Sequence, residues 1–163
     1  MKNITRSNFY LPMAAMILAA ALAVPAAAQH QVPFKGAMQG HDTDIGFTNN
    51  LATVLTVGTG IGAHLGQFSF TQTWTVDETT GHLTGSAQWF AANGDSISTT
   101  INGSGEIIEP GLVSITEVHT ITGGTGRFAG AQGSFTMTKL ASAVTFLTSG
   151  SFDGTITPPG AAH

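Results

Sequence analysis

The chain has 163 residues, contains no cysteine, and only 9% of its residues are charged. The absence of cysteine excludes disulfide cross-links, thiolate catalysis and cysteine-based metal sites. After residue 28, three basic residues stand against nine acidic ones, a net charge near −6 with neutral histidines. That balance argues against nucleic acid and anionic membrane surfaces as partners.

Residues 1–28 have the pattern of a cleavable secretory signal peptide. Lys2 and Arg6 supply positive charge near the start, an apolar stretch rich in alanine follows, and residues 26–28 are three alanines. The apolar stretch is too short to span a bilayer comfortably. We therefore expect a secreted or periplasmic protein with no stable membrane span after cleavage, in which residues 29–163 form a single domain.

Alternation with a period of two dominates the remaining sequence, and no window has a sustained helical period. In the clearest run, Phe68, Phe70 and Trp74 share one face with Val76, and serine, threonine and glutamine occupy the other. Weaker alternating runs precede and follow it. They place these further side chains on inward faces: Leu83, Trp89, Ile97, Thr99, Ile101, Phe135, Met137, Val144, Phe146, Phe152 and Ile156.

The connections between these runs are expected to be short and polar. The stretch His41–Asp44 and the pair Asn49-Asn50 predict a polar connection after a first strand at residues 34–40. The segment Gly58–Gly62 predicts a glycine-rich turn, and Asn93-Gly94 predicts a two-residue type I′ hairpin. The chain thus contains about eight strands, each with one apolar face.

About eight antiparallel strands can close into a small barrel or pack as two sheets of a sandwich. Closure removes the unpaired strand edges that promote aggregation. A sandwich uses the same alternating pattern, so the alternation alone leaves both architectures open.

Glu117 and His119 are the clearest candidates for catalytic residues. They lie two residues apart on one strand, so they share a face with Ile115 and Ile121. If that face is the interior, an acid and a base lie together in an apolar environment, where they could move a proton. The alternatives are a solvated pair on a reversed strand and a purely structural hydrogen-bonded pair inside.

The segment from Ile121 to Phe135 contains five glycines and predicts a shaped corner between two strands. Arg127, the only arginine after the expected signal peptide, lies at its tip. Arg127 could bind a carboxylate, or it could pair with an acid and fix the corner. The histidines have no spacing typical of metal ligands, so we expect no metal. Gly124–Ala129 has the letters of a dinucleotide-binding motif, but a strand pattern follows it where that motif needs a helix, so we expect no cofactor.

This corner, Ile121-Thr-Gly-Gly-Thr-Gly-Arg-Phe-Ala-Gly-Ala-Gln-Gly133, resembles the signature of the allene oxide cyclase barrel, and dirigent proteins carry a similar stretch. The hairpin Phe90–Asp95 also resembles the one before the corner in those barrels. The resemblance implies an all-β, calycin-like barrel of eight antiparallel strands, and association into a homo-trimer is a further expectation from related barrels. It transfers no catalytic residue, because the chain has no cysteine and no glutamate in its first strand.

The leading functional hypothesis is a non-catalytic exported barrel that binds a small apolar ligand or has a structural role. Phe68, Phe70, Trp74, Trp89 and Arg127 are its candidate ligand-binding residues. The alternative is a cofactor-independent isomerase or cyclase of a hydrophobic substrate, with Glu117 and His119 as catalytic residues.

Overall fold

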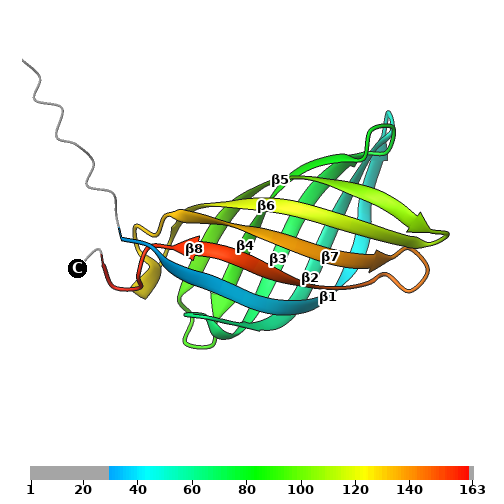
Figure 1. The fold of residues 1–163 in the computed structure, drawn as a ribbon. Coiled ribbons are helices and arrows are strands. Elements are labelled where there is room, and N and C mark those ends of the chain that lie inside the picture. The colour runs from blue at the N-terminus through cyan, green and yellow to red at the C-terminus, as the bar shows by residue number, and fades with distance from the viewer. Residues whose placement is uncertain (1–29, 162–163) are drawn as a thin grey trace, which may run out of the picture.

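A computed structural model describes residues 30–161, and the expected signal peptide lies outside the described residues. The fold is all-β, with one short 3₁₀ turn (Figure 1). Its elements are β1 (Val32–Thr48), β2 (Leu51–Gly62), β3 (Gly66–Asp77), β4 (His82–Ala91), β5 (Ser96–Glu109), β6 (Leu112–Gly124), η1 (Gly126–Phe128), β7 (Gly133–Ser142) and β8 (Leu147–Ile156).

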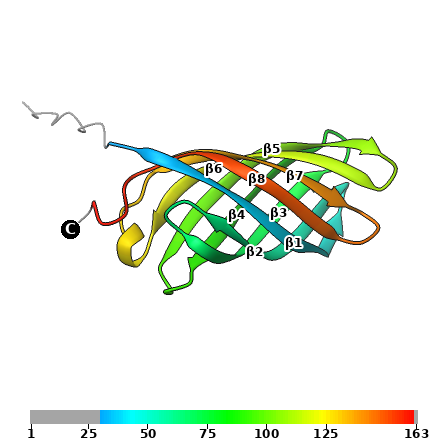
Figure 2. The same cartoon turned by 60° about the horizontal axis from the view of Figure 1, so that its bottom comes forward.

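Every strand pairs antiparallel with its neighbours in the chain, and β1 pairs with β8 to close the sheet. Figure 2 shows the first and last strands lying side by side along the barrel. The prediction of an eight-stranded antiparallel barrel is confirmed, and the sandwich is excluded. Closure pairs the first strand with the last from Val32 to His41, which removes the two free edges of an open sheet along that length.

The prediction of a turn at Gly58–Gly62 is wrong, because this segment continues β2. A Cβ atom at Gly58 would collide with the ring of Phe70, and one at Gly60 with the ring of Phe68. These glycines therefore face the interior and leave room for aromatic rings against the backbone. The connection to β3 follows them, where His64 has a φ of 65°.

The first strand is also longer than predicted. It runs through His41–Asp44 to Thr48, with an irregularity in register between Asp44 and Gly46. The turn to β2 consists of Asn49 and Asn50, both at positive φ (52° and 63°), a conformation that asparagine tolerates better than most residues.

Two other local predictions need correction. Val144 and Phe146 do not face the core: they lie in the β7–β8 connection and are 76% and 43% exposed. The Asn93-Gly94 turn is not type I′, since only Gly94 has a positive φ (88°). Backbone hydrogen bonds join Ala91 with both Gly94 and Asp95, so the loop is longer than two residues.

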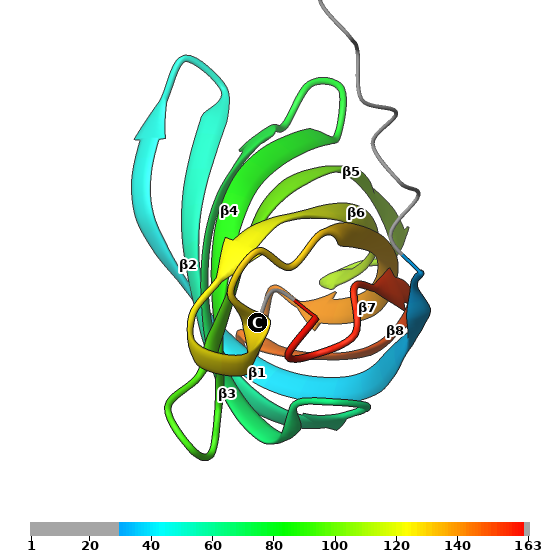
Figure 3. The ribbon, with the colours of Figure 1, turned by 90° about the vertical axis from the view of Figure 1, so that its left-hand side faces the viewer.

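The two ends of the barrel differ. At one end the glycine-rich corner and the C-terminal segment cross the opening, as Figure 3 shows from that side. Phe128 and Ala131 of the corner are buried there, and Gly160 donates a backbone hydrogen bond to Arg127. The opposite end is surrounded by the β1–β2, β3–β4, β5–β6 and β7–β8 connections, and we call it the mouth.

The interior near the closed end is filled by stacked rings. Trp89 stacks on Phe70 with ring centroids 5.1 Å apart and meets Phe135 edge-on at 5.5 Å. Phe34, Phe68 and Phe152 belong to the same cluster. All six side chains are at most 4% exposed, so this half of the barrel is a packed core.

Candidate ligand cavity and the polar layer beneath it

A cavity of about 670 Å³ occupies the mouth of the barrel. Its walls are mainly apolar and come from most of the strands, with Val54, Trp74, Leu83, Ile115 and Ala141 among the lining residues. Ligand-binding sites commonly have this size and an apolar lining with a few polar groups.

Asp42 is the most deeply placed polar residue that lines this cavity, and it is 8% exposed. Its Oδ1 atom accepts a hydrogen bond of 2.6 Å from the Thr56 hydroxyl, which accepts one of 3.0 Å from the Trp74 indole N–H. Burial raises the pKa of Asp42, against the opposing effect of the Thr56 hydrogen bond.

Directly beneath the cavity, the inward positions become polar. Trp74, Ile115 and Ala141 line the cavity, and two residues deeper along the same strands are Gln72, Glu117 and Lys139. None of these three side chains is more than 1% exposed. We call Thr56, Gln72, Thr99, Glu117, His119 and Lys139 the polar layer. It separates the cavity from the aromatic core.

Glu117 connects most of this layer. Its Oε1 atom accepts a hydrogen bond of 2.8 Å from Gln72 and lies 2.8 Å from the Lys139 ammonium, while Oε2 lies 3.2 Å from Nε2 of His119. Burial alone would raise the pKa of Glu117. The His119 hydrogen bond and the Lys139 charge outweigh it and lower the pKa to about 2, so Glu117 is an anion at neutral pH.

His119 is held as a neutral imidazole. Burial lowers its pKa, and Glu117 only partly offsets this effect. Because ionised Glu117 only accepts, Nε2 carries the proton, and Nδ1 accepts from the Thr99 hydroxyl at 3.0 Å. Trp89 donates to the same hydroxyl at 3.3 Å, and the imidazole stacks on Phe135 at 4.5 Å. The contact with Glu117 is thus a hydrogen bond and not an ion pair.

The positive charge of Lys139 is balanced mainly by the negative charge of Glu117. Its contact with Glu117 is close but does not have the angles of a hydrogen bond, and its ammonium lies 5.1 Å from the centroid of the Trp74 ring. Within residues 30–161, the Lys139 ammonium, Gln72 Oε1 and Thr148 Oγ1 are the buried side-chain polar atoms without a hydrogen-bond partner. All three lie on inward positions.

The structure confirms that Glu117 and His119 face inward and contact each other. Neither lines the mouth cavity or either of two hollows on the outside of the barrel. Gln72, Lys139 and Asp42 were missed by sequence reasoning: only the apolar members of the inward faces were named, and Asp42 was assigned to a polar connection. Strict alternation from Phe70 to Trp74 and from Phe135 to Met137 would have placed Gln72 and Lys139 inside.

The other candidate ligand-binding residues are dispersed. Trp74 lines the mouth cavity, whereas Phe70 and Trp89 lie in the packed aromatic core. Arg127 lies at the closed end, with its Nε 3.7 Å from Asp95 and its guanidinium over the Phe128 ring. Its contacts match the structural alternative, in which it pairs with an acid and fixes the corner.

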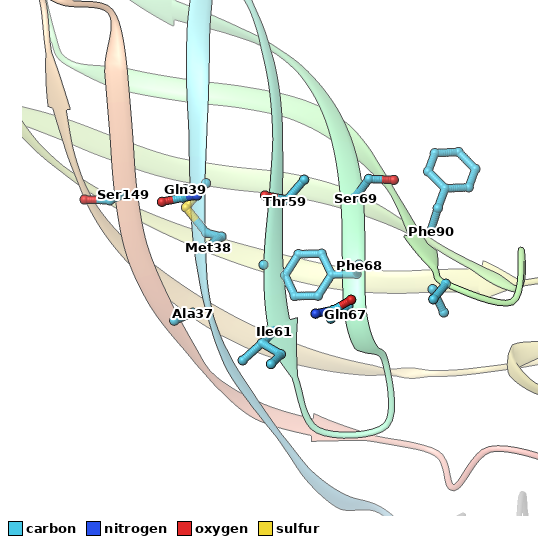
Figure 4. A pocket seen from close by; sticks show the side chains of 13 residues that line it. Ala37, Met38, Gln39, Thr59, Ile61, Gln67, Phe68, Ser69, Phe90 and Ser149 are labelled. Carbon is cyan, nitrogen blue, oxygen red and sulfur yellow. The ribbon is translucent and has the colours of Figure 1, made fainter.

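Phe68 also lies in the aromatic core, 5.4 Å from Trp89 between ring centroids. It borders a second hollow as well, an outer groove of about 800 Å³ on the surface of β1, β2 and β3. Figure 4 shows Ser149, Gln39, Thr59 and Ser69 in one row across neighbouring strands, as their register requires. This row is polar, and the exposed ring of Phe90 lies at its end. The outer groove is more open to solvent than the mouth cavity, and its lining is more polar.

Within residues 30–161, no three histidine, aspartate or glutamate side chains are grouped as metal ligands. The same residues contain no helix long and apolar enough to cross a membrane. Comparison with protein-family models and with curated proteins finds no match to the chain.

Proposed function

We propose that the protein binds a small, mainly apolar ligand in the mouth of the barrel and does not catalyse a reaction on it. The observation that carries this proposal is the cavity of about 670 Å³ above the polar layer. The binding free energy would become more favourable by about 25 cal/mol for each Å² of apolar surface that is removed from water when a ligand contacts the apolar walls of this cavity.

Apolar side chains around the mouth support the same proposal. Phe47, Ile107 and Val144 are 63%, 75% and 76% exposed and lie at three of the connections that surround the opening. Exposed apolar groups gathered at one site of a surface often mark a binding region. Here they would contact a ligand as it enters.

The isomerase hypothesis needs a substrate that reaches Glu117 and His119. These side chains are fully buried and their polar atoms are used within the polar layer. A catalytic role for the pair stays a prediction without a supporting cavity, and binding is the function that the cavity favours.

The test uses the neutral fluorescent probe N-phenyl-1-naphthylamine, which becomes brighter in apolar surroundings. Ala141→Phe fills the cavity from an inward position, and Ala37→Phe makes the same change in the outer groove. We expect saturable binding to the wild type and to A37F, and affinity at least about tenfold weaker in A141F.

Circular dichroism of both variants establishes that they are folded, and Ala52→Leu, at another inward position of the cavity, replaces A141F if that variant does not fold. Loss of binding in A37F with unchanged binding in the cavity variants would place the site in the outer groove and contradict the proposal.

A further inference from the structure

The charges that line the mouth cavity have one sign. Besides Asp42, the lining includes Asp44, Glu78 and Glu106, and these three are exposed near the opening. Among the described residues that line the cavity there is no lysine, arginine or histidine. A ligand with a carboxylate would therefore meet only like charges.

The base buried beneath the cavity, Lys139, does not change this pattern. Its ammonium is fully buried beneath the cavity, 2.8 Å from Glu117, and the Trp74 side chain that lines the cavity also covers it. Its charge is already compensated by Glu117, so it offers little attraction for an anionic ligand.

Asp42 gives the cavity a deep acceptor. More than nine tenths of the residue is buried, and Oδ1 is already bonded to Thr56, which leaves Oδ2 as the carboxylate oxygen available to a ligand in the cavity. Beneath the cavity, Gln72 Oε1 and Thr148 Oγ1 are fully buried acceptors without a partner. A buried carboxylate of this kind is stabilised by a cation or by hydrogen-bond donors.

We infer that the ligand of the mouth cavity is a hydrophobic amine, with its ammonium group against Asp42 and its apolar body along the cavity walls. This inference rests on the proposed binding function. The ammonium supplies a positive charge that attracts the lining carboxylates and hydrogen-bond donors for Oδ2. The rim acids Asp44, Glu78 and Glu106 would attract the same cation during entry.

Three ligands with the same ten-carbon chain test this inference: decylamine, 1-decanol and decanoate. Each competes with N-phenyl-1-naphthylamine for the wild-type cavity at pH 7.5, below its micelle concentration. We expect decylamine to displace half of the probe at a concentration at least about tenfold lower than decanol, because its ammonium adds charge attraction to the hydrogen bond that either ligand can donate to Asp42. Decanoate should be the weakest, because it brings a negative charge to a cavity lined by carboxylates.

Asp42→Asn should abolish most of the advantage of decylamine and leave competition by decanol unchanged. Asp153→Asn is the matched control, since Asp153 is an exposed acid on the outer surface that pairs with Lys35. It should change nothing. If D42N does not fold, the double variant D44N/E106Q replaces it: loss of these two rim acids should also reduce the advantage of decylamine over decanol.

The outcomes separate the inference from the proposed function. Equal competition by all three ligands, or an unchanged preference in D42N, overturns the amine inference while apolar binding stands. Failure of the probe and of every ligand to bind overturns the proposed function itself.

Discussion

At the scale of single residues, Glu117 holds the polar layer together. It contacts Gln72, His119 and Lys139 within 3.2 Å, and neither Glu117 nor Lys139 has solvent-exposed side-chain surface. A buried ion pair of this kind adds little net stability when complete. It becomes expensive when one partner is removed, because the other charge stays buried without compensation.

Glu117→Ala is therefore expected to lower the free energy of unfolding by about 3–5 kcal/mol, measured by urea denaturation. The control is Asp153→Ala, which breaks the exposed pair with Lys35 and should change stability by less than about 1 kcal/mol. The double variant E117L/K139M removes both buried charges and should be more stable than E117A. Equal loss in E117A and D153A would show that the buried pair has no special role.

The stability of the protein should fall on acidification. Relative to an unfolded chain, the folded state lowers the pKa of His119 below 6.5 and that of Glu117 from 4.5 to about 2. In both cases the unfolded chain binds more protons at low pH, so stability is complete above the unfolded pKa and decreases as pH falls. Asp42, whose pKa is raised, acts in the opposite direction.

Urea denaturation between pH 8 and pH 3 measures this dependence. We expect a first loss of stability below pH 6.5 from His119 and a further loss below pH 4.5 from Glu117, the latter reaching about 2 kcal/mol at pH 3. In His119→Gln the loss between pH 6.5 and pH 4.5 should be much smaller. A wild-type stability that rises throughout acidification would mean that Asp42 dominates.

At the scale of elements, the packing of β2 depends on glycines that leave space for aromatic rings. A methyl group at Gly60 would collide with the Phe68 ring and with the Ala37 carbonyl oxygen. Gly60→Ala should lower the free energy of unfolding by about 1–3 kcal/mol, as overpacking does in other cores. Gly46→Ala on β1 is the control, because its Cβ would meet only Thr53, at 3.9 Å.

Thermal and urea unfolding of G60A and G46A give this comparison directly. Near-equal stability of the two variants would indicate that β2 can move away from Phe68. The close packing of the ring against glycine would then not determine the stability of the barrel.

Much of the strand pattern could be predicted from the sequence, because alternation reports burial on one face of a sheet. It places Phe68, Phe70 and Trp74 inside, as observed. It fails at Gly58 and Gly60, since a glycine run has no side chain to alternate and the rings that fill the space come from another strand. Tertiary packing, not local preference, makes this segment a strand.

The candidate site was predicted less well than the fold. Glu117 and His119 were recognised because they interrupt an apolar face, but their partners Gln72, Thr99 and Lys139 come from three other strands. Which inward positions adjoin across a closed barrel depends on its register, which alternation within each strand does not contain. The mouth cavity could not be predicted for the same reason, because it exists only once the strands are closed around it.

At the scale of the whole molecule, the barrel has three zones along its axis: an open apolar cavity, a buried polar layer and a packed aromatic core. The corner and the C-terminal segment cover the core end (Figure 3), while the exposed side chains of Phe47, Ile107 and Val144 lie at the cavity end. Ligand binding at the mouth should therefore leave the closed end unperturbed. The two tryptophans lie in different zones, Trp74 at the cavity and Trp89 in the core.

The most direct test of the central claim is a two-dimensional ¹H–¹⁵N NMR titration of the two indole N–H signals with N-phenyl-1-naphthylamine. Trp74→Phe and Trp89→Phe assign the two signals. We predict a saturable shift of the Trp74 signal, with the Trp89 signal nearly unchanged. A saturable shift of backbone signals from the outer groove with no change at Trp74, or no saturable shift at all, would contradict binding in the mouth of the barrel.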